Sequence, residues 1–209
     1  MEKNKAYEIL NKLKEMYPNA KCELNYSSAF ELLVAVSLSA QTTDKRVNMV
    51  TAELFKRYKD ASELANANYS DVYEIIKSLG LATTKSQNII VLSKKLVEVY
   101  KGKVPSTREE LCTLPGIGRK SANVVLSEYF KKPALAVDTH VKRCANRLGL
   151  SEEDDVLKIE KDLCSLFNEE DYYSLHHSLI FFGRYFCKSV NPVCDKCPFI
   201  NICKRKRPW

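Results

Sequence analysis

Apolar residues recur at helical spacing through almost the whole chain of 209 residues. In residues 84–100, Ile89, Leu92, Leu96 and Val99 fall on one helix face. There is no Asn-Gly or Asp-Gly dipeptide and no sustained apolar–polar alternation, so the sequence does not support β-hairpins. The pattern therefore predicts an all-α fold. The expected helices span residues 6–16, 29–39, 44–58, 70–79, 84–100, 107–113, 119–130, 139–148 and 171–186. Another is expected to begin after Ser151 or a following acidic residue and to end near residue 167.

Short polar residues stand where these helices begin, and glycines follow several of them. The expected N-caps are Ser28, Asp44, Ser70, Asp138 and Asp171. The expected left-handed residues at helix ends are Gly80, Gly102 and Gly149.

Composition narrows the class of protein. A hydrophobic content of 45% is enough to form a core, which excludes disorder as the main state. No run approaches the roughly 18–20 apolar residues of a membrane helix, and the N-terminal MEKNKAYEIL lacks the apolar core of a signal peptide. We therefore expect a soluble protein of the cytoplasm with no membrane partner.

The net charge of +7 is unevenly distributed. Residues 101–150 hold ten basic and four acidic side chains, whereas residues 151–186 hold three basic and nine acidic ones. The last nine residues add the basic run Lys204, Arg205, Lys206 and Arg207. This segregation favours a surface that faces a polyanion, the alternative being an ordinary solvated face.

Four of the eight cysteines lie close together near the C-terminus, spaced Cys187-x6-Cys194-x2-Cys197-x5-Cys203. Four thiolates in one short loop predict a metal site rather than a disulfide framework, which is typical of much shorter secreted chains. Zinc is the general partner of four cysteines, but the single C-x2-C is less typical of zinc. The spacing alone leaves zinc and a [4Fe–4S] cluster both open.

The string LPGIGRKSANVV places a tight turn between two predicted helices. Two glycines, Gly116 and Gly118, let the backbone approach a ligand closely, and the N–H groups that open the next helix favour an anion such as a nucleic-acid phosphate. A mere tight turn is the alternative for Gly-x-Gly alone. The full string resembles the helix-hairpin-helix motif of DNA repair proteins.

Two residues near this turn have side chains suited to catalysis. Lys120 lies in the first turn of the helix, where the dipole disfavours a positive charge, and a neutral amine is what attack on a sugar carbon requires. Its alternative role is to bind phosphate. Asp138 in AVDTHVKR is an N-cap by local rules, and an ionised carboxylate there also stabilises positive charge on a bound sugar. His140 follows two residues later, and a structural or phosphate-contacting role fits it better than acid–base chemistry.

Together the hairpin with Lys120, the VDTH string with Asp138 and the cysteine spacing resemble endonuclease III, a family of bifunctional DNA glycosylase/AP lyases. The resemblance runs from SAQTTD at residues 39–44 to the last cysteine. It implies two helical lobes with a DNA groove between them. One lobe is a six-helix barrel of residues 22–132, and the other combines residues 1–21 and 133–209 around a [4Fe–4S] cluster.

The resemblance also implies a role for each site residue. Lys120 attacks C1′ of a flipped nucleotide with help from Asp138, and Gln41 and Leu81 enter the duplex from opposite sides of the gap. The residues expected to touch DNA are Gln41, Leu81, Pro115, Gly116, Ile117, Gly118, Arg119 and His140. The expected cluster ligands are Cys187, Cys194, Cys197 and Cys203.

The implied reaction is base-excision repair: removal of oxidised or ring-saturated pyrimidines from double-stranded DNA, followed by β-elimination on the 3′ side of the abasic site. The implied partner is duplex DNA with damaged pyrimidines or abasic sites. The enzyme is expected to be a monomer, associated with the nucleoid if the source is bacterial. The cluster is expected to be structural.

Two alternatives stay open. A monofunctional mismatch glycosylase on the same scaffold, for example an adenine-specific one, needs no lysine at position 120 and commonly has an added C-terminal domain. A non-catalytic helix-hairpin-helix module uses only the hairpin glycines. One departure from the family also stands out: the loop KSVNPV between Cys187 and Cys194 carries only Lys188 as a basic residue. The sequence therefore leaves open whether this loop contacts DNA, and the KRKR run is a candidate to replace it.

Overall fold

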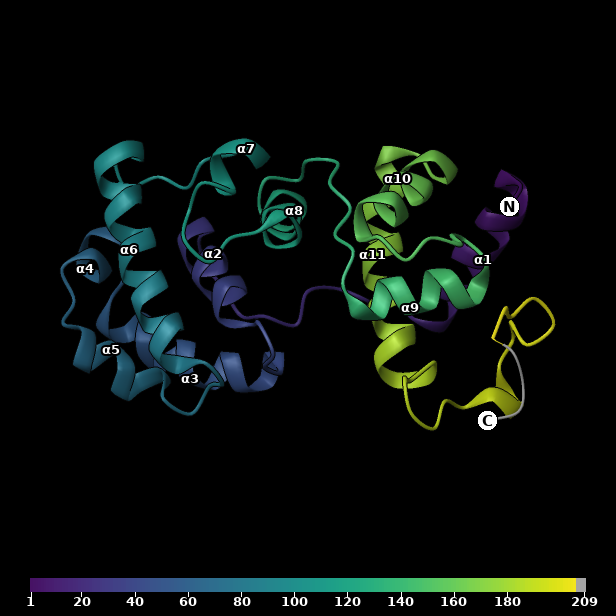
Figure 1. Cartoon of the computed structure of the whole chain (residues 1–209), viewed down its shortest axis with the longest axis horizontal. Helices are drawn as coiled ribbons and strands as arrows, with labels where there is room; N and C mark the ends of the chain where they lie inside the picture. Colours follow the sequence, from purple (N-terminus) through teal and green to yellow (C-terminus); the bar gives the residue numbers. More distant parts are fainter. Residues whose placement is uncertain (206–209) are drawn as a thin grey trace. The chain divides into compact units, whose positions relative to one another are not determined.

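The computed structural model describes residues 1–205 and contains no β-strand within them. It consists of helices joined by turns and loops (Figure 1), which confirms the all-α prediction. The chain divides into two compact units, Glu23–Lys132 and Met1–Cys22 with the segment from Pro133 onward. Within the described residues, no helix is long and apolar enough to cross a membrane.

The unit Glu23–Lys132 is built around a buried helix, α2. Its sequence AFELLVAVSL is apolar on nearly every side, and all residues from Leu32 to Leu38 are buried. The long helix α6 packs against α4 and α5 (Figure 1), and α2 packs against α3, α6 and α8. The helices of this unit are α2 (Ala29–Leu38), α3 (Asp44–Arg57), α4 (Ala61–Ala65), α5 (Tyr69–Ile76), α6 (Ala82–Tyr100), α7 (Arg108–Leu111) and α8 (Arg119–Glu128).

The second unit packs the N-terminal helix against helices from the C-terminal half. The buried side chains Ile9, Leu10 and Leu13 of α1 belong to the same core as Val141, Leu163 and Leu175. The Tyr7 hydroxyl donates to Asp171 Oδ2 at 2.9 Å, which ties α1 to the start of α11. The helices of this unit are α1 (Lys3–Met16), α9 (Thr139–Leu148), α10 (Val156–Leu166), the 3₁₀ turn η1 (Glu169–Asp171), α11 (Tyr172–Phe181), the π-helical turn η2 (Phe182–Phe186) and the 3₁₀ turn η3 (Cys194–Lys196).

Several helix ends differ from the sequence prediction. Ser28 caps α2 as predicted, accepting a hydrogen bond from the Glu31 N–H at 3.1 Å. The prediction that Asp44 caps α3 is wrong, because Thr43 caps that helix with its hydroxyl. Ser70 also lies inside its helix, one residue after the start of α5. A polar residue at a helix start therefore indicates the boundary only to within a residue or two.

The glycine predictions are partly confirmed. Gly102 and Gly149 adopt the left-handed conformation, with φ of +77° and +73°. Gly80 does not, and the left-handed residue at that boundary is Leu81, with φ of +61°. Leu81 ends the turn after α5 and directly precedes α6.

Candidate functional site

The turn between α7 and α8 contains the predicted hairpin. Gly116 has a φ of +78°, in the left-handed region that favours glycine. A Cβ atom on Gly116 would lie 3.0 Å from Ser37 Oγ and 3.1 Å from Asn88 Nδ2. Both the backbone conformation and the packing against α2 and α6 therefore require glycine here.

Gly118 serves a different purpose. Its φ of −96° is ordinary, and a Cβ atom there would meet nothing within 4 Å. It is exposed and is the N-cap of α8, and as a glycine it has no side chain with which to cap the helix. A helix N-terminus attracts an anion to its first-turn N–H groups.

The remaining hairpin residues divide into buried and exposed ones. Ile117 is buried, and its N–H donates to the Leu114 carbonyl at 3.1 Å, which closes the turn. Pro115 is half-buried. Arg119 and Lys120 are exposed on the first turn of α8. The Lys120 amine is thus open to a ligand that binds at the hairpin.

Gln41 and Leu81 lie on two neighbouring loops of the same unit. Both residues are exposed, Leu81 to 58%, and both adopt the left-handed conformation, with φ of +55° and +61°. The two loops approach each other, since a Cβ on Gly80 would lie 4.0 Å from the Gln41 carbonyl oxygen. A non-glycine residue in this conformation stores strain, a feature that clusters at functional sites.

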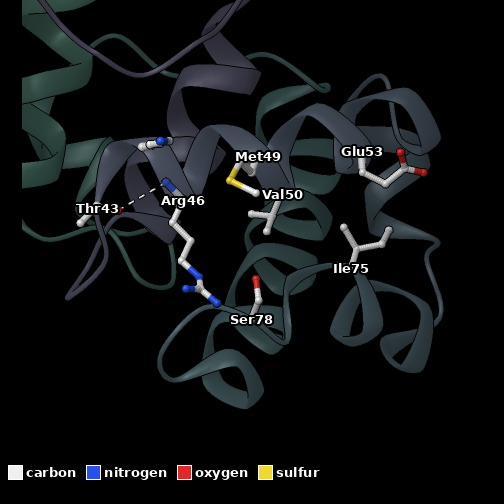
Figure 2. A pocket seen from close by; sticks show the side chains of 8 residues that line it. Thr43, Arg46, Met49, Val50, Glu53, Ile75 and Ser78 are labelled. Atoms are coloured by element: carbon white, nitrogen blue, oxygen red, sulfur yellow. Dashed lines mark hydrogen bonds between the residues drawn. The ribbon is translucent and has the colours of Figure 1, made fainter.

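A cavity of about 500 Å³ opens between α3 and α5, a few residues from each of these loops. Figure 2 shows the Arg46 side chain extending toward Ser78, and Met49, Val50 and Ile75 supply the apolar part of the lining. Met49 is 69% exposed. None of the residues predicted for the site lines this cavity.

Asp138 caps α9, as its sequence position predicts. Its Oδ1 accepts a hydrogen bond from the Val141 N–H at 2.7 Å, and the side chain is half-buried. The preceding segment Ala134–Val137 is buried, and His176 Nδ1 lies 2.9 Å from the Ala136 carbonyl, to which it donates. The backbone that leads into Asp138 is therefore held on both sides.

His140 is held by Arg143. Arg143 Nη2 lies 3.1 Å from His140 Nδ1 and donates to the Gly183 carbonyl at 2.8 Å. Arginine is only a donor, so His140 Nδ1 accepts and the ring proton resides on Nε2. Burial lowers the pKa of His140, and the charges of Arg143 and Arg184 act in the same direction, against Asp138. The neutral ring can thus donate from Nε2.

The four C-terminal cysteines lie in the segment that follows η2, and Cys187 is the first residue after that turn. Cys187 Sγ accepts from Arg147 Nη1 at 3.3 Å. The pKa of Cys187 is lowered because the buried Cys144 thiol donates to its sulfur and because Arg147 stabilises the thiolate. Burial raises the pKa of Cys197, as does the proximity of the other three thiols.

These sulfurs do not converge on one point. Within residues 1–205, no three or more His, Cys, Asp or Glu side chains form a group that could hold a metal ion. A four-iron cluster binds each thiolate through a different iron, so its ligands lie further apart than those of one ion. The donor set, four cysteines with a stabilised thiolate at Cys187, fits such a cluster.

The structure brings together some of the predicted residues. The hairpin, Lys120, Gln41 and Leu81 belong to the unit Glu23–Lys132. Asp138, His140 and the four cysteines belong to the other unit. Arg143 and Arg147 of α9 connect His140 to Cys187, since Arg143 Nε donates to the Cys187 carbonyl at 3.1 Å. Sequence analysis missed these arginines, although their i, i+4 spacing places them on one face of α9.

Comparison with known proteins agrees with this geometry. Residues 34–169 match the model of the HhH-GPD superfamily of base excision DNA repair proteins. The chain is 49% identical to the endonuclease III of Bacillus subtilis over 93% of its own length and 90% of that protein. Its identity to the Escherichia coli endonuclease III is 41%, over 99% of this chain and 98% of the relative. The chain belongs to the endonuclease III family.

Solved structures of the endonuclease III family match the fold as well. A non-covalent endonuclease III–DNA complex superimposes with a TM-score of 0.94 at 43% identity, over 98% of this chain and 96% of the other. A trapped endonuclease III–DNA covalent intermediate matches equally well. The chain is thus a base excision repair enzyme with DNA glycosylase and AP lyase activities, as the resemblance implies.

Proposed function

We propose that the enzyme removes oxidised or ring-saturated pyrimidines from duplex DNA, with Lys120 as nucleophile and Asp138 as the charge that assists it. The observation that carries the proposal is the exposed Lys120 amine, two residues after Gly118 and beside the open N-terminus of α8. A phosphate bound by the hairpin N–H groups holds the DNA backbone at Lys120.

Lys120 Nζ forms a bond to C1′ of the damaged nucleotide, and the glycosidic bond breaks with its electron pair leaving on the base. The Asp138 carboxylate stabilises the positive charge that develops on the sugar. Its hydrogen bond to the Val141 N–H keeps one oxygen fixed, which leaves the other for this task. The amine loses a proton as it bonds to C1′, and this loss balances the proton that the departing base gains.

The second half of the reaction uses the same lysine. Once the sugar ring opens, Lys120 is joined to C1′ as a Schiff base, which makes the C2′ protons acidic. Loss of one C2′ proton expels the 3′ phosphate by β-elimination and cuts the strand. Water then releases Lys120 and restores the amine. One chain carries every group that this reaction needs, so we propose that a monomer acts alone.

We also propose that Cys187, Cys194, Cys197 and Cys203 hold a [4Fe–4S] cluster with a structural role. A bound cluster would cross-link the C-terminal loop. The residues that support it belong to the chain itself: Arg147 contacts the Cys187 sulfur, and Arg143 contacts its carbonyl. Both arginines lie on α9, the helix that Asp138 caps.

Two duplexes test the proposed reaction. One carries a single thymine glycol and the other a preformed abasic site. We expect release of the damaged base from the first and 3′ cleavage of both. Base release without cleavage would instead indicate a monofunctional glycosylase. Binding to either duplex with no reaction would indicate a non-catalytic DNA-binding module.

A further inference from the structure

Lys85 of α6 is a buried lysine, and burial of its charged ammonium costs free energy of folding. It is 4% exposed and lies among the buried residues Ala82, Ser86 and Ile89. Within residues 1–205 no carboxylate lies within ion-pair distance of its ammonium. Burial without an opposite charge disfavours an ammonium, and it lowers the pKa of Lys85. A methionine or leucine would fill the same space without this cost.

The ammonium is directed at the loop that carries Gln41. Lys85 Nζ donates to the Ala40 carbonyl at 2.7 Å and to Thr42 Oγ1 at 3.0 Å. These acceptors are the two residues that flank Gln41. The Thr42 N–H closes the same turn on the Ser39 carbonyl at 3.1 Å. Gln41 in its left-handed conformation is therefore held from both sides.

The backbone of Lys85 is bonded to the other loop. Its N–H donates to the Leu81 carbonyl at 2.9 Å, the first helical hydrogen bond of α6 after the left-handed Leu81. A single residue thus bonds to the neighbours of Gln41 with its side chain and to Leu81 with its main chain. The approach of Gly80 to the Gln41 carbonyl adds a direct contact between the loops.

We propose that Lys85 is a positioning residue that fixes Gln41 and Leu81 relative to each other, so that both enter the duplex together when the damaged nucleotide leaves it. This role rests on the proposed function, in which Gln41 and Leu81 fill the space that the nucleotide vacates. Filling that space requires two side chains at a set separation. Gln41 and Leu81 both have strained backbone conformations, which would relax if the two loops were released.

Lys85→Met tests this role, because methionine matches the length of the stem and removes only the ammonium. The thermal midpoint should change little, because removal of a buried charge without an ion-pair partner offsets the loss of its two hydrogen bonds. Amide hydrogen exchange in residues 39–43 and 80–82 should nevertheless speed up. Lys94→Met, an exposed lysine on the same helix, is the matched control and should change neither.

The reaction gives the second readout. Single-turnover base release from the thymine-glycol duplex should slow by about tenfold to a hundredfold in Lys85→Met, the range that a small misplacement costs. Binding to undamaged duplex and cleavage of a preformed abasic site should change little. In a Gln41→Ala background, Lys85→Met should cost much less than in the parent, because the residue through which it acts is gone. Thr42→Val, which removes one acceptor at a half-buried site, should show a weaker form of the same effects.

Each failure has its own signature. Unchanged exchange in both loops for Lys85→Met, or equal costs in the parent and the Gln41→Ala background, would overturn the positioning role while the proposed function stands. A parent enzyme that releases no base from the lesion duplex would overturn the proposed function. In that case the exchange data would still decide whether Lys85 couples the two loops. If Lys85→Met does not fold, Thr42→Val supplies both measurements.

Discussion

Asp138 combines a local structural role with a proposed chemical one. Asparagine caps a helix about as well as aspartate, so Asp138→Asn should keep the bond to the Val141 N–H and the stability of α9. It removes the charge, so the activation free energy of base release should rise by about 3 kcal/mol, as is typical when a group that stabilises a developing charge is removed. Single-turnover kinetics on the thymine-glycol duplex, with thermal unfolding alongside, measures both. If the Asn variant releases the base as fast as the parent, Asp138 acts only as the helix cap and has no part in the chemistry.

His140 provides a test by titration. Its pKa should lie below the ordinary value of 6.5, because burial and the neighbouring guanidinium of Arg143 both disfavour the charged ring. Between the lowered folded pKa and the unfolded pKa near 6.5, the unfolded chain binds more protons. The contribution of His140 to stability is therefore complete above that range and is lost as the pH falls through it. An NMR titration that gave a pKa above 6.5 would contradict this environment.

At the scale of single residues, the sequence predicts residues whose role depends on a few neighbours better than residues that hold the site in place through distant partners. Asp138 and Gly116 follow from local rules, since a cap and a left-handed turn are properties of a few neighbouring residues. The roles of Lys85 and His176 do not follow from local rules. The hydrogen-bond partners of Lys85 lie 43 and 45 positions away in the chain, and that of His176 lies 40 positions away. A buried polar residue in a helix reveals its role only when the fold brings its partner to it.

The hairpin offers a matched pair of glycines at the scale of an element. Gly116→Ala should destabilise the unit by roughly 1–3 kcal/mol, because alanine is strained at positive φ and its Cβ would approach Ser37 and Asn88 closely. Gly118→Ala should cost less, about 0.5 to 1 kcal/mol, because its Cβ would meet nothing and only the poorer N-capping by alanine remains.

DNA binding should respond differently to the Gly118 change. If the N–H groups of α8 hold a phosphate, a methyl group in that open space should weaken binding by about tenfold, which corresponds to about one charge-assisted hydrogen bond. The loss should be equal for undamaged and lesion duplexes, since backbone N–H groups read phosphate and not sequence. Denaturant unfolding and salt-matched binding assays separate the two variants. A loss confined to lesion DNA would mean that the hairpin reads the base.

Helix existence could be predicted from periodicity, whereas boundaries and short turns could not. The helix α4, capped by Asp60, has five residues, too few for a periodic pattern to show. The predicted helix of residues 171–186 widens at Phe182 into a π-helical turn. Gly183 explains the close packing there, since a Cβ would lie 2.9 Å from His140 Cβ. Contact with α9, which no local rule records, accounts for that glycine.

At the scale of the molecule, the cysteine loop is expected to couple cofactor and folding. The protein purified without oxygen should be brown and contain four irons and four sulfides per chain, with little zinc. Cys194→Ala should lose folded protein before it loses chemistry, because metal binding at such sites contributes folding free energy. Metal and sulfide analysis, with circular dichroism of the variant, measures this. One zinc and no sulfide would contradict it.

The first residue of the basic KRKR run lies against the end of α9. Lys204 lies near Gly149, since a Cβ atom on Gly149 would lie 3.2 Å from Lys204 Cε. The Lys204 N–H donates to the Arg147 carbonyl at 2.8 Å. Lys206 and Arg207 lie outside the described residues. The proposed part of the KRKR run in DNA binding, and the DNA groove between the two lobes, stay predictions.

Covalent trapping tests the proposed nucleophile directly. The parent enzyme and Lys120→Gln are each mixed with the thymine-glycol duplex in the presence of borohydride, which reduces a Schiff base to a stable amine. We expect the parent to give an adduct whose modified peptide contains Lys120. The glutamine variant should give none, although its affinity for undamaged duplex persists, because one charge among many phosphate contacts is a small loss. A trapped adduct in Lys120→Gln, or a parent adduct on another residue, would place the nucleophile elsewhere and contradict the mechanism.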